Sequence, residues 1–153
     1  MEREDYMRRA LALAREAAAA GDVPVGAVVV DESGAVIGEG RNRREERRSA
    51  VHHAEIEAIE QACRALDSWR LDDCTLYVTL EPCPMCAGAV INARIPVLVY
   101  GAKEPLTGSC GSVLNLFEER YGFRPAIYGG VLGDECAALL RDFFRGLRNA
   151  DGI

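Results

Sequence analysis

Three side chains that bind transition metals, His53, Cys83 and Cys86, stand at the starts of two predicted helices. Cys83 and Cys86 are three residues apart, so they share one face of their helix. The free N–H groups and the positive dipole end at a helix start lower the pKa of a thiol and favour metal binding. One imidazole and two thiolates make three ligands, whereas a structural zinc ion normally takes four from the protein. The set therefore predicts one catalytic zinc ion per chain, with one coordination position open for water.

Glu55 stands two residues after His53 and is a candidate general acid and base beside that water. A C-x-x-C pair alone is a weak signal, because redox motifs and structural zinc sites also use it. The stretch His53-Ala54-Glu55 followed by Pro82-Cys83-Pro84-Met85-Cys86 matches the H-x-E…P-C-x-x-C pattern of zinc deaminases. The neighbouring His52 does not keep this register, so we interpret it as a loop or substrate-facing residue. Both motifs together indicate deaminase chemistry.

Hydrophobic periodicity predicts the elements that must position these residues. Helices are expected at 5–20, 53–66, 84–93, 114–120 and 133–148, and strands at 23–30, 35–39, 74–80 and 97–100. The arginine-rich stretch 41–48 and the glycine-punctuated stretch 101–112 are expected to be loops. Because helices alternate with strands, we expect an α/β sandwich with helices on both faces of the sheet. No repeat or composition break divides the chain, so residues 1–153 are predicted to form a single domain.

The charge distribution gives two opposing indications about nucleic acid. The net charge of −6 argues weakly against a nucleic-acid partner, since phosphate binding usually requires a basic surplus. The stretch 41–48, however, holds five arginines against two glutamates, and the stretch 141–148 holds three arginines against one aspartate. From charge alone, a solvated surface is the favoured interpretation of both clusters. Charge alone therefore does not decide the partner.

The cysteine usage and the first residues bear on the compartment. The chain has six cysteines at uneven spacing, and four of them lie in apolar patterns typical of small core residues. The first five residues are acidic and lack the apolar region of a signal peptide, and no apolar run is long enough to span a membrane. We therefore expect a cytoplasmic protein without a membrane partner, in which the even number of cysteines does not imply disulfides.

The motifs and their flanking stretches together resemble the bacterial tRNA-specific adenosine deaminases, which lie within the cytidine deaminase-like superfamily. The zinc motifs indicate only the superfamily, and the flanking stretches indicate this branch. The matching stretches span nearly the whole chain: 23–27, 40–43, 53–55, 68–71, 76–95, 107–108, 111–112 and 130–145. The resemblance implies a three-layer α/β/α sandwich with a central mixed sheet. It also implies that His53, Cys83 and Cys86 bind zinc and that Glu55 moves the proton.

The resemblance further implies a set of substrate contacts. Asn42 would hydrogen-bond the target base, Val25 and Gly26 would line the nucleoside pocket, and backbone groups near Ala54 would help to hold the base. Glu104 occupies a place usually held by Asp, which meets the anticodon ribose, so the longer side chain keeps the charge and changes the reach.

The implied reaction is deamination of adenosine to inosine at the wobble position of a tRNA anticodon, with release of ammonia. The family suggests an arginine tRNA with an ACG anticodon, and a homodimer in which each partner shapes the other's groove. The chain departs from the family at Val51 and His52, where Thr-Ala is usual, and at Phe123 and Arg124, where an Asn-His pair is common. These departures concern RNA contacts, because Phe can stack on a base and Arg can bind phosphate.

Two other functions fit parts of the sequence. A deaminase of a free nucleoside or base, such as guanine or cytosine, would share every zinc residue and would fit the acidic net charge better. A non-catalytic, zinc-stabilised binding module would share the ligands, but a structural site has no need of the carboxylate of Glu55.

Overall fold

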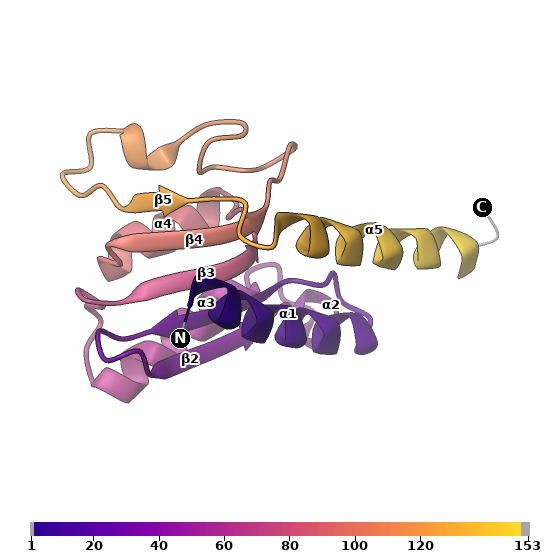
Figure 1. The fold of residues 1–153 in the computed structure, drawn as a ribbon, viewed down its shortest axis with the longest axis horizontal. Helices are drawn as coiled ribbons and strands as arrows, with labels where there is room; N and C mark the ends of the chain where they lie inside the picture. The colour runs from indigo at the N-terminus through magenta and orange to yellow at the C-terminus, as the bar shows by residue number, and fades with distance from the viewer. Residues whose placement is uncertain (1, 151–153) are drawn as a thin grey trace.

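The computed structural model describes residues 2–150 and confirms the expected fold class, an α/β sandwich around a mixed sheet (Figure 1). The strands in this range are β1 (Gly26–Val30), β2 (Val36–Arg41), β3 (Thr75–Leu80), β4 (Val97–Ala102) and β5 (Ala126–Tyr128). The α-helices are α1 (Arg3–Ala19), α2 (Arg44–Arg47), α3 (Ala54–Leu66), α4 (Pro84–Ala93) and α5 (Gly133–Ala150), and a 3-10 helix, η1, spans Leu116–Glu118. Helices α1 and α5 cover one face of the sheet, and α3 and α4 cover the other.

The strand order β2-β1-β3-β4-β5 and the strand directions bring four chain segments to one end of the sheet. Strands β3, β4 and β5 run parallel, so the segments that follow β3 and β4 leave the sheet at the same end. Strand β1 is antiparallel to both β2 and β3. It therefore begins at this end of the sheet, and β2 ends there. Residues just before β1, after β2 and after β3 and β4 consequently converge, although they are far apart in sequence.

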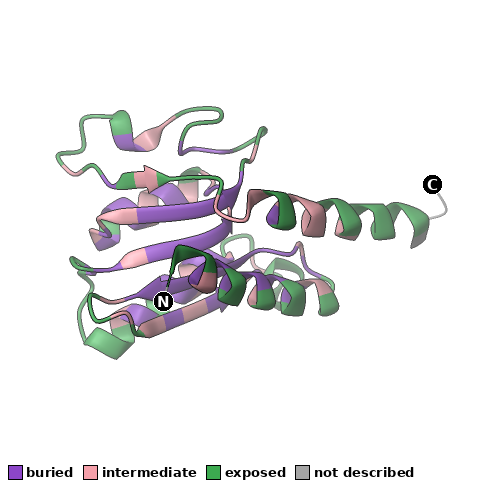
Figure 2. Cartoon of the chain, viewed as in Figure 1, coloured by how far each residue is buried: buried purple, intermediate pink, exposed green. Residues whose placement is uncertain are grey.

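Glycines in β2 allow helix α3 to lie directly on the sheet. A Cβ atom on Gly40 would lie 2.1 Å from the carbonyl oxygen of Ala54, and one on Gly38 would lie 2.2 Å from that of Ala58. Side chains are excluded at such contacts, so only glycine permits this approach. The central strands beneath the helices are buried along most of their length (Figure 2). The first turn of α3 is thereby fixed against a rigid support.

The arginine-rich segment is not the loop that we expected, because it contains the short helix α2. The buried carboxylate of Asp22 explains this helix. It accepts hydrogen bonds from the backbone N–H groups of Glu45 at 2.7 Å and Glu46 at 3.1 Å, which satisfies donors that a helix start leaves free. Asp22 is more than twenty residues away in sequence, so no local pattern indicates the cap.

The helix expected at 114–120 is also wrong, since only the three-residue η1 forms there. The side chain of Asn115 accepts a hydrogen bond from the backbone N–H of Phe117 at 3.1 Å, and Phe117 is buried. The preceding Val113 and Leu114 are 56% and 45% exposed. An α-helix needs a continuous apolar stripe against the core, and this segment offers one buried anchor.

Helix α5 begins where it was predicted, but its second half extends beyond the sheet (Figure 1). Cys136, in the first turn, is buried, whereas Phe144 and Leu147 are 42% and 46% exposed. The apolar stripe predicted for this helix is therefore core only in its first half. No helix within residues 2–150 combines the length and apolar character needed to cross a membrane.

Candidate active site

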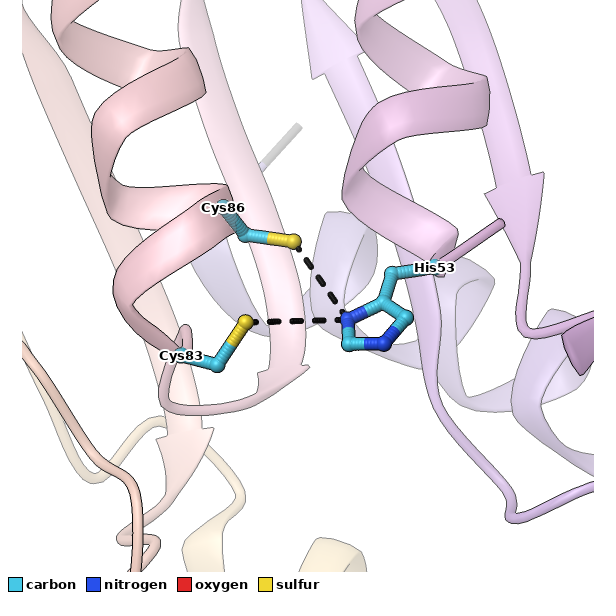
Figure 3. Close-up of side chains that lie close together, drawn as sticks. All are labelled: His53, Cys83 and Cys86. Carbon is cyan, nitrogen blue, oxygen red and sulfur yellow. Dashed lines mark hydrogen bonds between the residues drawn. The ribbon is translucent and has the colours of Figure 1, made fainter. Parts of the chain in front are cut away.

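Two helix starts bring His53, Cys83 and Cys86 together, as the sequence predicted. His53 is the N-cap residue of α3, Cys83 is the N-cap residue of α4, and Cys86 lies in the first turn of α4. Pro84 occupies the first position of α4, where its missing N–H is not needed. The imidazole of His53 points from one helix toward both sulfur atoms on the other (Figure 3). The His53 Nδ1 atom lies 3.7 Å from the Cys83 Sγ atom and 3.6 Å from the Cys86 Sγ atom.

These distances fit three ligands of one tetrahedral ion. Zinc bound at its usual distances to nitrogen and sulfur, with a tetrahedral angle between them, would hold the two atoms about 3.6 Å apart. The ligand atoms of all three residues lie within 4.8 Å of one another. Within the described part of the chain, no other trio of His, Cys, Asp or Glu side chains forms such a group. The arrangement can therefore hold a metal ion and leaves one position of a tetrahedron without a protein ligand.

The protonation of the two thiols shows why this site suits a cation. Hydrogen bonding from Cys86 lowers the pKa of Cys83 to about 4, and the bond between the two thiols together with burial raises the pKa of Cys86. The hydrogen bond to Cys83 raises the pKa of His53. Of the two thiols, Cys83 therefore ionises more readily. A divalent cation would take the place of the thiol protons.

Glu55 lies one residue inside α3 and is 4% exposed. Burial raises the pKa of its carboxyl group to about 7, because the ionised form loses hydration. Its carboxylate lines the pocket beside the ligand trio without being part of it. A carboxyl group with a pKa near neutrality can both accept and return a proton at physiological pH, as a general acid and base must.

One pocket of about 230 Å³ opens in front of these residues. That volume is below the range of drug-sized ligand sites, about 300–1,000 Å³, and so fits a small group such as a single base. Of the substrate contacts expected from the sequence, Val25, Asn42, Ala54 and Glu104 line it. They reach it from the start of β1, the end of β2, the first turn of α3 and the loop after β4, as the sheet order requires.

Two of these residues are already held by hydrogen bonds. The amide nitrogen of Asn42 donates to the carbonyl of Val23 at 3.2 Å, and its amide oxygen accepts from the backbone N–H of Arg44 at 3.2 Å. The Glu104 carboxylate accepts from the backbone N–H of Leu106 at 2.9 Å. Both side chains are therefore preorganised at the pocket wall before any substrate binds.

Gly26 does not line the pocket, which corrects the expectation that it would. A Cβ atom on Gly26 would lie 1.9 Å from the carbonyl oxygen of Ala10 and 2.7 Å from the backbone nitrogen of Ala14, both in α1. The glycine therefore lets α1 lie against β1. Its neighbour Val25 is the residue of this turn that reaches the pocket.

Six pocket residues were not among the site residues predicted from the sequence: Val23, Arg44, Leu80, Glu81, Thr107 and Phe144. Arg44 belonged to a cluster for which a solvated surface was the favoured interpretation. Phe144 was assigned to a core stripe, and only the length of α5 beyond the sheet shows that it reaches the pocket. Glu81 stands two residues before the C-x-x-C pair, and that position was the one available signal for it.

The arginines of segment 41–48 divide into two groups. Arg43 is paired with Glu57 at 2.6 Å and with Glu46 at 2.7 Å, and Arg41 is paired with Glu46 at 3.0 Å. Arg44, Arg47 and Arg48 are exposed, and none of them has an ion pair with a described side chain. Only this second group is available for a ligand.

His52 faces this ion-pair network and not the pocket. Its Nε2 atom lies 2.7 Å from the Glu57 carboxylate. Partial burial raises the pKa of Glu57, but the hydrogen bonds from His52 and Arg43 outweigh burial and lower it. The substrate-facing interpretation of His52 is therefore replaced by a structural one.

Phe123 and Arg124 are distant from the site. Their loop precedes β5, and Ala126 after it bonds to Pro96 just before β4, so the loop lies at the end of the sheet where the parallel strands begin. Arg124 donates hydrogen bonds to the carbonyl oxygens of Phe117 and Glu118, and Arg94 lies over the Phe123 ring at 5.7 Å. Both departures from the family pattern have structural partners here.

Comparison with known proteins agrees with the geometry. The family model of MafB19-like deaminases matches residues 1–148, so the class that the fold and the site define is a deaminase. The chain is 47% identical to the tRNA-specific adenosine deaminase of Bacillus subtilis (strain 168) over 146 residues, which cover 95% of this chain and 90% of that protein. This chain therefore belongs to the family of tRNA-specific adenosine deaminases.

Solved structures give the same fold with two substrate classes. A structure from a study of A-to-I editing by tRNA:A34 deaminases matches with a TM-score of 0.85 and 42% identity, covering 89% of this chain and 99% of that one. The guanine deaminase of Nitrosomonas europaea matches with a TM-score of 0.81 and 31% identity, covering 92% and 83%. The catalytic fold is thus shared between enzymes that act on RNA and on a free base.

Proposed function

We propose that this protein is a zinc-dependent hydrolase that converts adenosine to inosine at the wobble position of a tRNA anticodon and releases ammonia. The observation that supports it most is the buried carboxyl group of Glu55 beside the His53, Cys83 and Cys86 trio, in a pocket of single-base size. The nearest similarity among the proteins described above is to enzymes named for this tRNA reaction.

Zinc fits the ligand set because imidazole and thiolate are its preferred donors and three protein ligands typify a catalytic site. When bound, it supplies a nucleophile at neutral pH by lowering the pKa of water. Glu55 would take the proton released in that step and pass it to the ring nitrogen next to the reacting carbon. It would then take the proton of the hydroxyl group added to that carbon and deliver it to the amino group, which would leave as ammonia. Its pKa of about 7 suits both transfers.

The pocket wall is suited to holding a purine. Val25 and Phe144 offer apolar surface for the faces of a ring, and Asn42 offers the remaining N–H of its amide group. Glu104 would meet a ribose hydroxyl group. A base in a single-stranded loop is already unstacked, so bringing it into such a pocket costs less than extruding it from a duplex.

An RNA substrate, as opposed to a free base, is supported by the charge next to the pocket. Arg44 lines the pocket, and Arg47 and Arg48 follow it on α2 and at its end, all exposed and without described ion pairs. Phosphates that flank a target base would pass near such side chains, whereas a free base has no phosphate to contact. We accordingly propose that the substrate is an anticodon stem-loop, with an arginine tRNA of ACG anticodon as its expected source. We also propose that the enzyme is cytoplasmic and acts as a homodimer, as the family resemblance implies.

Deamination of a free base remains the second candidate, because the guanine deaminase fold is nearly as similar. The two functions are separated by measuring ammonia release from five substrates at equal concentration: an anticodon stem-loop, adenosine, guanine, cytosine and cytidine. We expect release from the stem-loop far above that from any free compound. Release from guanine or cytosine with an inert stem-loop would overturn the proposal.

A further inference from the structure

Glu81 is a buried carboxylate that the reaction does not use and that one loop surrounds with donors. It is 2% exposed and follows β3 directly, two residues before Cys83. One of its oxygens accepts the backbone N–H groups of Cys110 and Ser112, each at 3.0 Å. The other accepts the backbone N–H of Glu104 at 3.1 Å and the hydroxyl group of Ser112. Four donors from residues 104–112 thus converge on a single side chain.

Backbone contacts continue the same attachment. The N–H of Glu81 donates to the carbonyl of Ala102 at 2.8 Å, and the N–H of Ser109 donates to that of Pro82 at 2.9 Å. The outer side of the loop has no comparable support, since Leu106 is 83% exposed. The turn that precedes the metal ligands therefore supplies one attachment of this loop. Buried Cys110 and the N–H of Leu116, which donates to the carbonyl of Ser109 at 2.8 Å, supply another at its far end.

The attached loop forms part of the substrate pocket. Glu104 and Thr107 line the pocket together with Glu81 itself. The backbone N–H of Glu104 donates to the Glu81 carboxylate, and the Glu104 carboxylate accepts from the backbone N–H of Leu106. The position of the Glu104 carboxylate relative to the metal ligands is consequently determined through Glu81.

We propose that Glu81 is a positioning residue, which holds the loop 104–112 against the metal-ligand turn and so fixes the Glu104 side of the substrate pocket. This inference rests on the proposed function for the identity of the substrate, but the attachment itself is independent of it. Glu81 would act on substrate binding and not on metal binding, because its carboxylate belongs to neither the ligand trio nor the proton transfer.

Two substitutions disturb this attachment in different ways. In Glu81→Gln, the amide NH₂ group replaces one acceptor oxygen. If the NH₂ group takes the position of the oxygen that binds Glu104 and Ser112, the Ser112 hydroxyl group can rotate and accept a hydrogen bond from it. The backbone N–H of Glu104 cannot accept, so it alone loses its partner. In Gly108→Ala the carboxylate remains, but the new Cβ would lie 2.6 Å from the Glu81 carboxyl group and 2.4 Å from the carbonyl oxygen of Glu104. The loop must then move away.

Amide hydrogen exchange of the metal-loaded full-length protein tests the attachment directly. A hydrogen bond to a charged acceptor is strong enough that its loss should speed exchange about tenfold or more. We expect this at Glu104 in Glu81→Gln, and at Glu104, Cys110 and Ser112 in Gly108→Ala. Unchanged exchange at these three amides in both variants would overturn the proposal.

Two matched controls separate the attachment from general loosening. Asp22→Asn alters another buried carboxylate and should speed exchange at Glu45 and Glu46 of α2 while leaving 104–112 protected. Gly146→Ala adds a methyl group where no atom lies within 4 Å, and should change neither segment. Fast exchange throughout the protein in Glu81→Gln would count against a positioning role.

Kinetics on an anticodon stem-loop test the consequence for the substrate. For Glu81→Gln and Gly108→Ala we expect KM to rise about tenfold, kcat to stay within about threefold, and the metal content per chain to be unchanged. A merely structural role would lower kcat in proportion to folded, metal-loaded protein and leave KM alone, and that result would overturn the proposal. If the unaltered protein does not deaminate the stem-loop, the proposed function fails, and the exchange rates still decide whether Glu81 holds the loop.

Discussion

The buried carboxyl group of Glu55 should lower the stability of the metal-free protein at neutral pH while being indispensable for the reaction. Its pKa of about 7 in the folded protein lies above the ordinary value of 4.5. The folded state therefore binds an extra proton between these pH values, and stability is lost as the pH rises through this window. Below pH 4.5 the carboxyl group is neutral in both states and has no such effect.

The magnitude follows from the size of the shift. Each pKa unit corresponds to about 1.4 kcal/mol, so ionising Glu55 in the folded protein should cost about 3 kcal/mol at pH 8. Glu55→Gln has no ionisable group at this position. The free energy of unfolding of Glu55→Gln minus that of the unaltered protein should therefore increase by about 3 kcal/mol between pH 4.5 and pH 8.

The assay is urea unfolding of both proteins after chelator treatment, at several pH values across this window. Using the difference between the two proteins cancels the titration of groups that Glu55 does not influence; the shifts that Glu55 causes in His53 and Cys86 belong to the measured difference. In parallel, the metal-loaded variant should bind as much metal as the unaltered protein and lose deamination by about 10²–10⁴-fold, the usual contribution of general acid–base catalysis. A stability difference that does not change with pH, or turnover near the unaltered rate, would refute this account of Glu55.

Three further predictions concern the metal, the RNA and the assembly. Elemental analysis should find one zinc per chain. Cys86→Ala should lose both the metal and stability, because metal binding is coupled to the folded state. A Cys86→Ala protein that still holds zinc would contradict the proposed ligand set. The affinity for a stem-loop should fall steeply with salt, and Arg44→Ala combined with Arg47→Ala should reduce the slope of log K against log salt by about 1.4, at about 0.7 per phosphate contact on a single strand. Arg43→Ala is the control, since that arginine is already paired with two glutamates and should leave the slope unchanged. Sedimentation of the purified protein should give the mass of a dimer, and a monomer at assay concentration would contradict the assembly expected from the family.

The sequence was sufficient to predict that His53, Cys83 and Cys86 meet, because most of that geometry is local, and zinc binding by these residues stays a prediction. Cys83 and Cys86 lie at the start of α4, and His53 and Glu55 lie two residues apart at the start of α3. Only the contact between the two helix starts depended on the fold. The alternation of helices and strands likewise predicted the sandwich. The extension of one domain over residues 1–153 stays a prediction.

Features that depend on distant contacts could not be predicted in the same way. Helix α2 exists because Asp22 caps it, and Arg43 is unavailable because Glu57 lies opposite it. Gly26 was assigned to the pocket from its place in a motif, whereas the approach of α1 explains why that position is glycine. The helical pattern of the sequence predicts Phe144 as a core residue. It is exposed because α5 extends beyond the sheet, so the sheet does not cover this side chain.

The most direct test of the central claim is reverse-transcription sequencing of an anticodon stem-loop with adenosine at the wobble position, after incubation with the zinc-loaded protein. We predict that this adenosine alone is read as guanosine, the signature of inosine, and that Glu55→Gln leaves it read as adenosine. A wobble adenosine that stays unchanged under the unaltered zinc-loaded protein, while the same preparation releases ammonia from free guanine, would contradict the account.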